Sequence, residues 1–203
     1  MMDNMGVINP LRSHGSVHNV VVLYYTIKNL PPKFNLCFAN VHLLILCYSH
    51  DLSVHCFEPV LNAFVSEIKE LSTTGLTGEF PILGNTTVYA SLCQVTCDNL
   101  ALNKMFGFVE SFSGSYFCTV CYAMSEQIQV WYREEQFQWR TVDLYNKDIA
   151  GLQAAKQQGR NHCRGVKSTC KLNEIDGFHV VNNLTLDVMR IVLDDLISIV
   201  WFV

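Results

Sequence analysis

Hydrophobic and polar positions form one clear helical pattern and several short apolar runs in the first half of the chain. Over residues 57–73, apolar side chains recur at every third or fourth position with Glu and Lys opposite, which predicts an amphipathic helix. Residues 17–30 are rich in β-branched and aromatic side chains and end at two prolines, so they predict a strand. The apolar run at residues 35–52 fits a strand or a short helix, and its pattern leaves both open.

The second half begins with a glycine-rich connection, and residues 87–97 then predict a strand that Asp98 follows directly. Residues 99–112 predict a helix or turn, and residues 125–158 form a polar, helix-prone stretch typical of an insertion with a solvated face. An apolar helix is predicted from Thr185 to the last residue. This alternation of strands and helices favours an α/β domain in which helices cover a sheet.

Composition places the chain among folded proteins, because half of its 203 residues are hydrophobic and only 16% are charged. No apolar run approaches the roughly 20 residues of a membrane span, so no membrane partner is expected. The N-terminus lacks the pattern of a signal peptide, which indicates a nuclear or cytoplasmic protein that is not secreted. In such a reducing compartment, close pairs among the nine cysteines indicate metal ligands or core thiols.

Charge gives little indication of a nucleic-acid partner, because the net charge is −4. One basic cluster stands out near the end of the polar stretch. Its side chains would either line a groove that contacts phosphates or solvate a loop, and they are Lys156, Arg160, Arg164, Lys167 and Lys171.

The sequence supports two interpretations of Asp98. Ligands meet α/β sheets at the carboxyl ends of strands, where a carboxylate is placed to hold a metal ion or a proton. Asp is also a preferred N-cap, whose side chain accepts hydrogen bonds from the first N–H groups of the next helix. Local chemistry alone favours the cap.

Cys118 and Cys121 form a Cys-x-x-Cys pair, whose spacing allows two thiolates to reach one Zn²⁺. We predict a zinc site that His162 and Cys170 complete, although Cys163 and His179 offer similar chemistry nearby. The pair could instead be two core thiols. A redox role is the least supported interpretation, because the aromatic residues that flank the pair do not suggest an activated thiol.

Three acids, Asp187, Asp194 and Asp195, lie on the predicted C-terminal helix. One of them could face the sheet and add a carboxylate to the region of Asp98, or all three could face water.

Several segments, taken in order, resemble transposases of the CACTA (En/Spm-type) cut-and-paste elements. The resemblance covers nearly the whole chain and is carried by "NPLRSHGSVHNV", "YYTIKNLPPKF", "VYASLCQVTCDNLALN", "GFVESFS", "YFCTVCYA", "RGVKSTCKLNEIDGFHV" and "LDVMRIVL".

The resemblance implies an RNase H-like core, a mixed sheet flanked by helices, in which three acids hold two Mg²⁺ ions for DNA strand cleavage and transfer. The first acid lies on the first strand, the second follows the fourth strand, and the third lies on a late helix. Carried over by position, these are Asp3, Asp98 and Asp194. A mainly helical insertion carrying Cys118 and Cys121 precedes the late helix.

The resemblance divides the chain into a first part of the core at 1–112, the Cys-x-x-Cys insertion at 113–172 and a C-terminal helix region at 173–203. Asp194 stands where relatives tend to have Glu, Arg190 replaces a His, and both ends suggest truncation. We therefore expect a transposase-derived domain whose DNA-cleaving activity has decayed. The alternative is a non-catalytic, zinc-stabilised module that binds DNA or protein.

Overall fold

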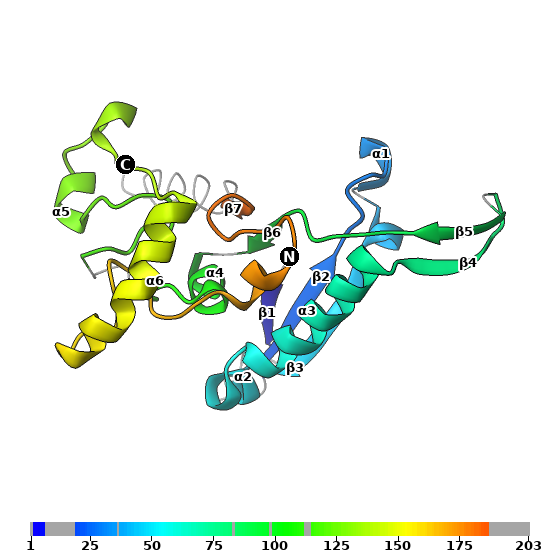
Figure 1. Cartoon of the computed structure of the whole chain (residues 1–203), viewed down its shortest axis with the longest axis horizontal. Helices are drawn as coiled ribbons and strands as arrows, with labels where there is room; N and C mark the ends of the chain where they lie inside the picture. The colour runs from blue at the N-terminus through cyan, green and yellow to red at the C-terminus, as the bar shows by residue number, and fades with distance from the viewer. Residues whose placement is uncertain are drawn as a thin grey trace. The chain divides into compact units, whose positions relative to one another are not determined.

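The computed structural model describes residues 2–6, 19–35, 37–82, 84–97, 99–111 and 115–186 (Figure 1). Asp98, Asp194 and the predicted C-terminal helix beyond residue 186 lie outside these residues. The chain forms two compact units. Unit 1 comprises Met1–Pro59, Thr96–Ala101 and Leu186–Val203, and unit 2 comprises Val60–Val95 and Leu102–Thr185.

The larger of two sheets has five strands in the order β3-β2-β1-β6-β7. Along the chain these strands are β1 (Met2–Gly6), β2 (Asn19–Tyr25), β3 (His42–Tyr48), β6 (Val95–Cys97) and β7 (Leu184–Leu186). β1 and β3 both pair antiparallel with β2, whereas β6 is parallel to β1. The α/β class is therefore confirmed as a mixed sheet accompanied by helices.

Unit 1 has its core on β2, where Val21, Val22 and Leu23 are all buried. The strand predicted over residues 17–30 is confirmed for its first part and ends at Tyr25. The ambiguous run at residues 35–52 forms β3 followed by the helix α2 (Ser49–His55).

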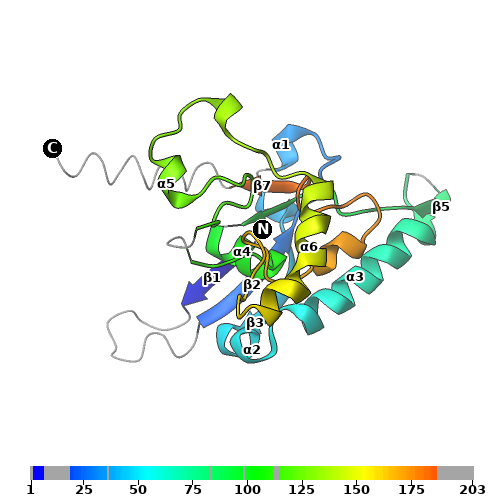
Figure 2. The same ribbon diagram turned by 60° about the vertical axis from the view of Figure 1, so that its left-hand side comes forward.

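The connection between β2 and β3 contains the short helix α1 (Pro32–Asn35) and the 3₁₀ turn η1 (Phe38–Asn40). In both views α1 and α2 lie at opposite ends of the β2–β3 pair (Figure 2).

Helices dominate unit 2. The predicted helix at residues 57–73 is confirmed as α3 (Glu58–Thr73), whose residues Leu61 and Val65 are buried one turn apart. The polar stretch at residues 125–158 is helical chiefly in its last half. The remaining helical elements are α4 (Asn99–Phe106), α5 (Ser125–Ile128), η2 (Glu134–Gln136), α6 (Val142–Gln157) and η3 (Lys171–Glu174).

Two predictions for residues 74–97 are wrong. The glycine-rich connection contains β4 (Leu76–Phe80), which pairs antiparallel with β5 (Gly84–Val88) in a hairpin that projects beyond the end of α3 (Figure 1). The strand predicted over residues 87–97 is interrupted, because residues 89–94 lie in neither β5 nor β6. Gly75 has a φ of 74° and accounts for the turn between α3 and the hairpin.

Thr185 was expected to begin a helix, but it lies in β7. β-branched Thr185 and its two Leu neighbours suit a strand, and strand propensity depends on such packing context. Within the described part of the chain, no helix is both long and apolar enough to cross a membrane.

The core of unit 2 gathers segments that are far apart in sequence. Leu102 and Phe106 are fully buried on α4, and Val166 and Val180 are equally buried in the segment that follows α6. Val109 donates a backbone hydrogen bond to Gly165 at 2.9 Å, and Phe108 and Val166 form a β-bridge. The segment around Val166 is thus part of the core rather than a surface loop.

Leu102→Ala is expected to lower the free energy of unfolding by about 2–5 kcal/mol, because it removes a fully buried side chain and leaves a cavity. Leu100→Ala, on the same helix, is the control, because Leu100 is half exposed and its loss should cost less than about 0.5 kcal/mol. Urea denaturation measures both. Equal losses would contradict the burial of Leu102.

Candidate functional site

Of the three predicted acids, only Asp3 lies among the described residues, on a strand that pairs with both β2 and β6. Asp3 lies in β1 opposite Val22 of β2. Met2, which precedes Asp3, is the register partner of Cys97 on the parallel strand β6. In the sequence Cys97 immediately precedes Asp98. Asp98 and Asp194 are outside the described residues, so their roles and that of Asp3 stay predictions.

The Cys-x-x-Cys pair is brought together in unit 2. The Cys118 and Cys121 thiols are hydrogen-bonded to each other, and Cys121 is buried while Cys118 is partly exposed. Burial, together with the neighbouring Cys118 thiol, raises the pKa of Cys121 to about 11. At neutral pH the Cys121 thiol therefore carries its proton, which a bound metal ion would displace.

The other two predicted zinc ligands are not assembled with this pair. Cys170 is buried, and burial raises the pKa of its thiol to about 12. The Nδ1 atom of His162 accepts a hydrogen bond from the backbone N–H of Gly165 at 3.2 Å. Among the residues that the structure describes, no three His, Cys, Asp or Glu side chains gather as a metal site. Two of the four ligands of a closed zinc site are thus in place, and zinc stays a prediction.

The strongest charged cluster of unit 2 centres on Asp148, whose side chain is fully buried on α6. One carboxylate oxygen, Oδ2, accepts from Arg140 Nη1 at 3.1 Å and from the Tyr122 hydroxyl at 2.7 Å. The other, Oδ1, accepts from Arg164 Nε at 2.6 Å. A buried carboxylate needs such complete pairing, because transfer out of water is costly for a bare charge. We call these four residues the Asp148 cluster.

Arg140 links the Asp148 cluster to the Cys-x-x-Cys loop. Its side chain, also fully buried, donates to the carbonyls of Thr119 and Cys118, each at 3.2 Å. It donates in addition to the carbonyl of Arg164 at 3.2 Å. The planar guanidinium has enough fixed donors to satisfy all of these acceptors and Asp148 together. The carbonyls that shape the cysteine loop therefore depend on one buried cation.

Aromatic rings close the cluster. The Arg140 guanidinium lies 4.2 Å from the centroid of the Tyr122 ring and 5.3 Å from that of Phe108, and Arg164 lies 4.9 Å from the Tyr122 ring. Burial and the hydrogen bond to Asp148 raise the pKa of Tyr122 to about 12. The tyrosine therefore stays protonated and donates, and the carboxylate has no position left for a metal ion.

Ion pairs occupy most of the predicted basic cluster. Arg164 pairs with Asp148, Lys167 with Glu110 at 2.8 Å, and Lys171 with Glu174 at 2.5 Å. Lys156 and Arg160 are exposed and form no ion pair within the described part of the chain. Among the residues that the structure describes, three of the five cations thus have a carboxylate partner.

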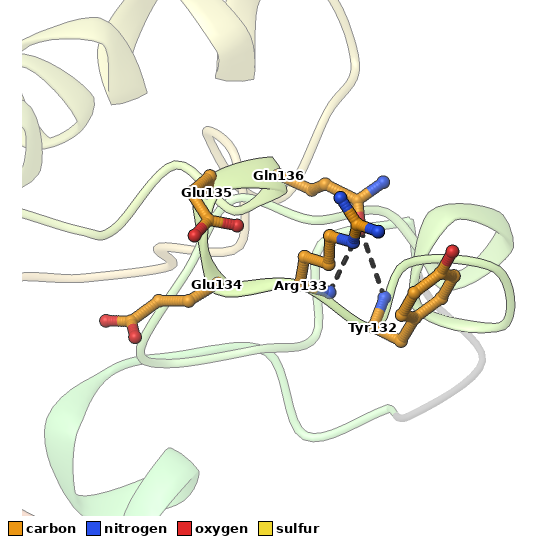
Figure 3. Close-up of a pocket in the computed structure, with 5 residues that line it drawn as sticks. All are labelled: Tyr132, Arg133, Glu134, Glu135 and Gln136. Atoms are coloured by element: carbon orange, nitrogen blue, oxygen red, sulfur yellow. Dashed lines mark hydrogen bonds between the residues drawn. The ribbon is translucent and has the colours of Figure 1, made fainter.

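A shallow hollow on the surface is lined by residues Tyr132 to Gln136 (Figure 3). Gln136 Oε1 accepts from the backbone N–H groups of Tyr132 and Arg133 at 3.2 and 3.0 Å, which closes a local turn. The Glu134 and Glu135 carboxylates point to the opposite side from the Tyr132 ring. Because these groups do not converge, the hollow has no arrangement for catalysis.

The Asp148 cluster was not foreseen from the sequence, yet one signal was available. Tyr145, Asp148, Leu152 and Ala155 recur at helical spacing along α6, and all four are buried. A carboxylate within an apolar stripe requires a buried cation. Arg140, which stands just before the helix, was the available partner.

Comparison with models of protein families, with curated proteins and with solved structures finds no match to this chain.

Asp148→Asn is expected to lower the free energy of unfolding by about 3–5 kcal/mol, because it leaves the Arg140 charge buried without a counter-ion. The Cys118 and Cys121 thiols should also react faster with a thiol reagent, since their loop carbonyls depend on Arg140. Urea denaturation and thiol titration measure the two effects.

Asp143→Asn is the matched control for this substitution, because Asp143 is exposed in the first turn of the same helix. Its stability and thiol reactivity should stay close to those of the wild type. If the two variants behave alike, the Asp148 cluster does not hold the cysteine loop.

Proposed function

We propose that this chain carries a transposase-derived, RNase H-like domain whose ancestral activity was Mg²⁺-dependent cleavage and joining of DNA strands. In this proposal Asp98 is the central metal ligand, with Asp3 and Asp194 outside it, and catalysis itself has decayed. Carboxylates are the ligands that Mg²⁺ prefers, and two bound ions would stabilise the attacking and leaving oxygens.

The observation that carries the proposal is the pairing of β1 with β6. Two adjacent parallel strands hold Met2 and Cys97 in register, and each of these residues precedes a predicted acid in the sequence. Among the five strands of the larger sheet, β6 is the fourth in chain order, and the resemblance puts the second acid after the fourth strand. This register sets the start of β1 beside the carboxyl end of β6, and ligands bind α/β sheets at the carboxyl ends of strands.

Asp98→Asn is expected to weaken binding of Mn²⁺ to the full-length chain at least tenfold, because it removes the carboxylate between two others. Electron paramagnetic resonance of Mn²⁺ titrations measures the free ion. Asp51→Asn is the matched control, since Asp51 is an exposed acid of the same unit and should leave Mn²⁺ binding unchanged. Equal Mn²⁺ affinity in wild type and Asp98→Asn would rule out the assignment of Asp98.

The accompanying cleavage assay uses supercoiled plasmid with Mg²⁺ or Mn²⁺. The proposal predicts that the wild type nicks the plasmid no faster than Asp98→Asn does. If the wild type nicks the plasmid and Asp98→Asn does not, the DNA-cleaving activity has survived. In that case the assignment of Asp98 holds, and only the proposed loss of activity is wrong.

A second candidate function is a zinc-stabilised interaction module without catalysis. The hydrogen-bonded Cys118 and Cys121 thiols support it, because they already lie within reach of one ion. The chain would then use zinc to fix the cysteine loop for binding DNA or protein.

Cys118→Ser is expected to remove the zinc that copurifies with the wild type, as measured by plasma emission spectrometry. Zinc affinity of the wild type should rise with pH, because both thiols must lose protons and burial opposes this at Cys121. Cys37→Ser is the control, since Cys37 is an exposed thiol elsewhere in the chain. Near-zero zinc in the wild type would refute the zinc site.

A further inference from the structure

The connection between β2 and β3 exposes an unusual amount of apolar surface. Phe38 is 96% exposed, and Ile27, Tyr25 and Phe34 are between 42% and 49% exposed. Several exposed apolar side chains within one short connection are candidates for an interaction site. We call the patch the β2–β3 platform, which consists of Tyr25, Ile27, Lys28, Lys33, Phe34, Phe38 and His42.

Two rings of the platform, those of Tyr25 and His42, are positioned by the pairing of β2 with β3. Tyr25 and His42 are register partners at the ends of β2 and β3, and their rings stack with centroids 5.0 Å apart at an interplanar angle of 29°. The Phe34 backbone N–H donates to Pro31 O at 2.9 Å, and Asn40 Nδ2 donates to Phe34 O at 2.8 Å. These bonds fix the backbone between the strands, so binding would not have to order it.

Charge on the platform has one sign. Lys28 and Lys33 are exposed and form no ion pair within the described ranges. The sequence has no Asp or Glu from residue 19 to residue 50, although the whole chain carries a net charge of −4. Lys33 Nζ lies 4.9 Å from the centroid of the Phe34 ring, so one cation and one aromatic ring of the platform are in contact.

We propose that the β2–β3 platform binds single-stranded nucleic acid. Unpaired bases stack on the exposed rings of Tyr25, Phe34 and Phe38, and the Lys28 and Lys33 ammonium groups contact the phosphates between them. Stacking of this kind accepts any base, because every base has a π face, and the lysines make binding depend on salt. A duplex hides its base faces, so it gains only the contribution of the lysines.

The inference goes beyond the proposed metal-dependent function. None of the platform residues belongs to the three predicted acids, and binding is measured in EDTA, where Mg²⁺ and Mn²⁺ are absent. If the platform variants show no effect on nucleic-acid binding, the assignment of Asp98 as a metal ligand is unaffected. If Asp98 proves not to bind metal, the proposed nucleic-acid binding at the platform is likewise unaffected.

The experiment measures fluorescence anisotropy of fluorescein-labelled oligodeoxythymidine titrated with the full-length chain in EDTA over a range of salt concentrations. Phe38→Ser removes one exposed ring. The double variant Lys28→Gln/Lys33→Gln removes two charges and keeps the rings.

Matched controls lie in unit 2. Tyr132→Ser removes a ring that is 83% exposed, and Lys156→Gln/Arg160→Gln removes two exposed cations of the basic cluster. All variants change exposed side chains, and circular dichroism verifies that each is folded.

Phe38→Ser is expected to weaken binding of oligodeoxythymidine about tenfold through the loss of one stacked base. The lysine double variant should reduce the slope of log affinity against log salt by about 1.4, because two phosphate contacts are lost. Both controls should bind like the wild type.

Three outcomes overturn the platform. They are unchanged affinity in Phe38→Ser and the lysine double variant, a loss that appears in Lys156→Gln/Arg160→Gln instead, and binding to phosphatidylserine vesicles with none to oligodeoxythymidine.

Discussion

The buried Asp148 carboxylate is the constraint on which unit 2 depends. It joins α6, the segment around Arg164 and the segment from Tyr122 to Arg140, which contains α5 and η2, through charge-assisted hydrogen bonds. Because a buried charge tolerates no missing partner, the three segments can pack in only one relative arrangement. Gly165, at a φ of 89°, lets the backbone pass close to Tyr116, which adds a second restraint on the same segments.

This constraint also reaches the candidate chemistry. Arg140 also donates to the carbonyls of Thr119 and Cys118, so the buried charge pair and the loop that carries the two cysteines are held together. A preformed pair of ligands lowers the entropy that ion binding would cost. In the proposed zinc-stabilised module, the Asp148 cluster would serve as the supporting shell of the metal site.

The sequence predicted the elements whose pattern lies within a short window, and it did not predict the features that depend on contacts with residues far away in the chain. α3 and β2 follow from periodicity and β-branched content, both of which lie within a short window. The β4–β5 hairpin was missed because its Gly and Thr residues resemble a loop, and Asp148 was missed because its partners lie 8 to 26 residues away. The Cys-x-x-Cys spacing predicts that Cys118 and Cys121 are neighbours, whereas the burial of Cys170 in the core is not encoded in any spacing.

Loss of catalysis is compatible with retained binding in unit 1. Two-metal catalysis requires carboxylates held to within about 0.5 Å, and Asp194 has a shorter side chain than the Glu expected from the resemblance. Stacking and phosphate contacts tolerate far larger displacements, because ring faces and lysines have no single required geometry. On β2, Tyr25 lies three residues beyond Val22, the partner of Asp3, which corresponds to about 10 Å along the strand. A nucleic-acid strand bound at the proposed platform would therefore lie within a few nucleotides of the position of Asp3 on β1.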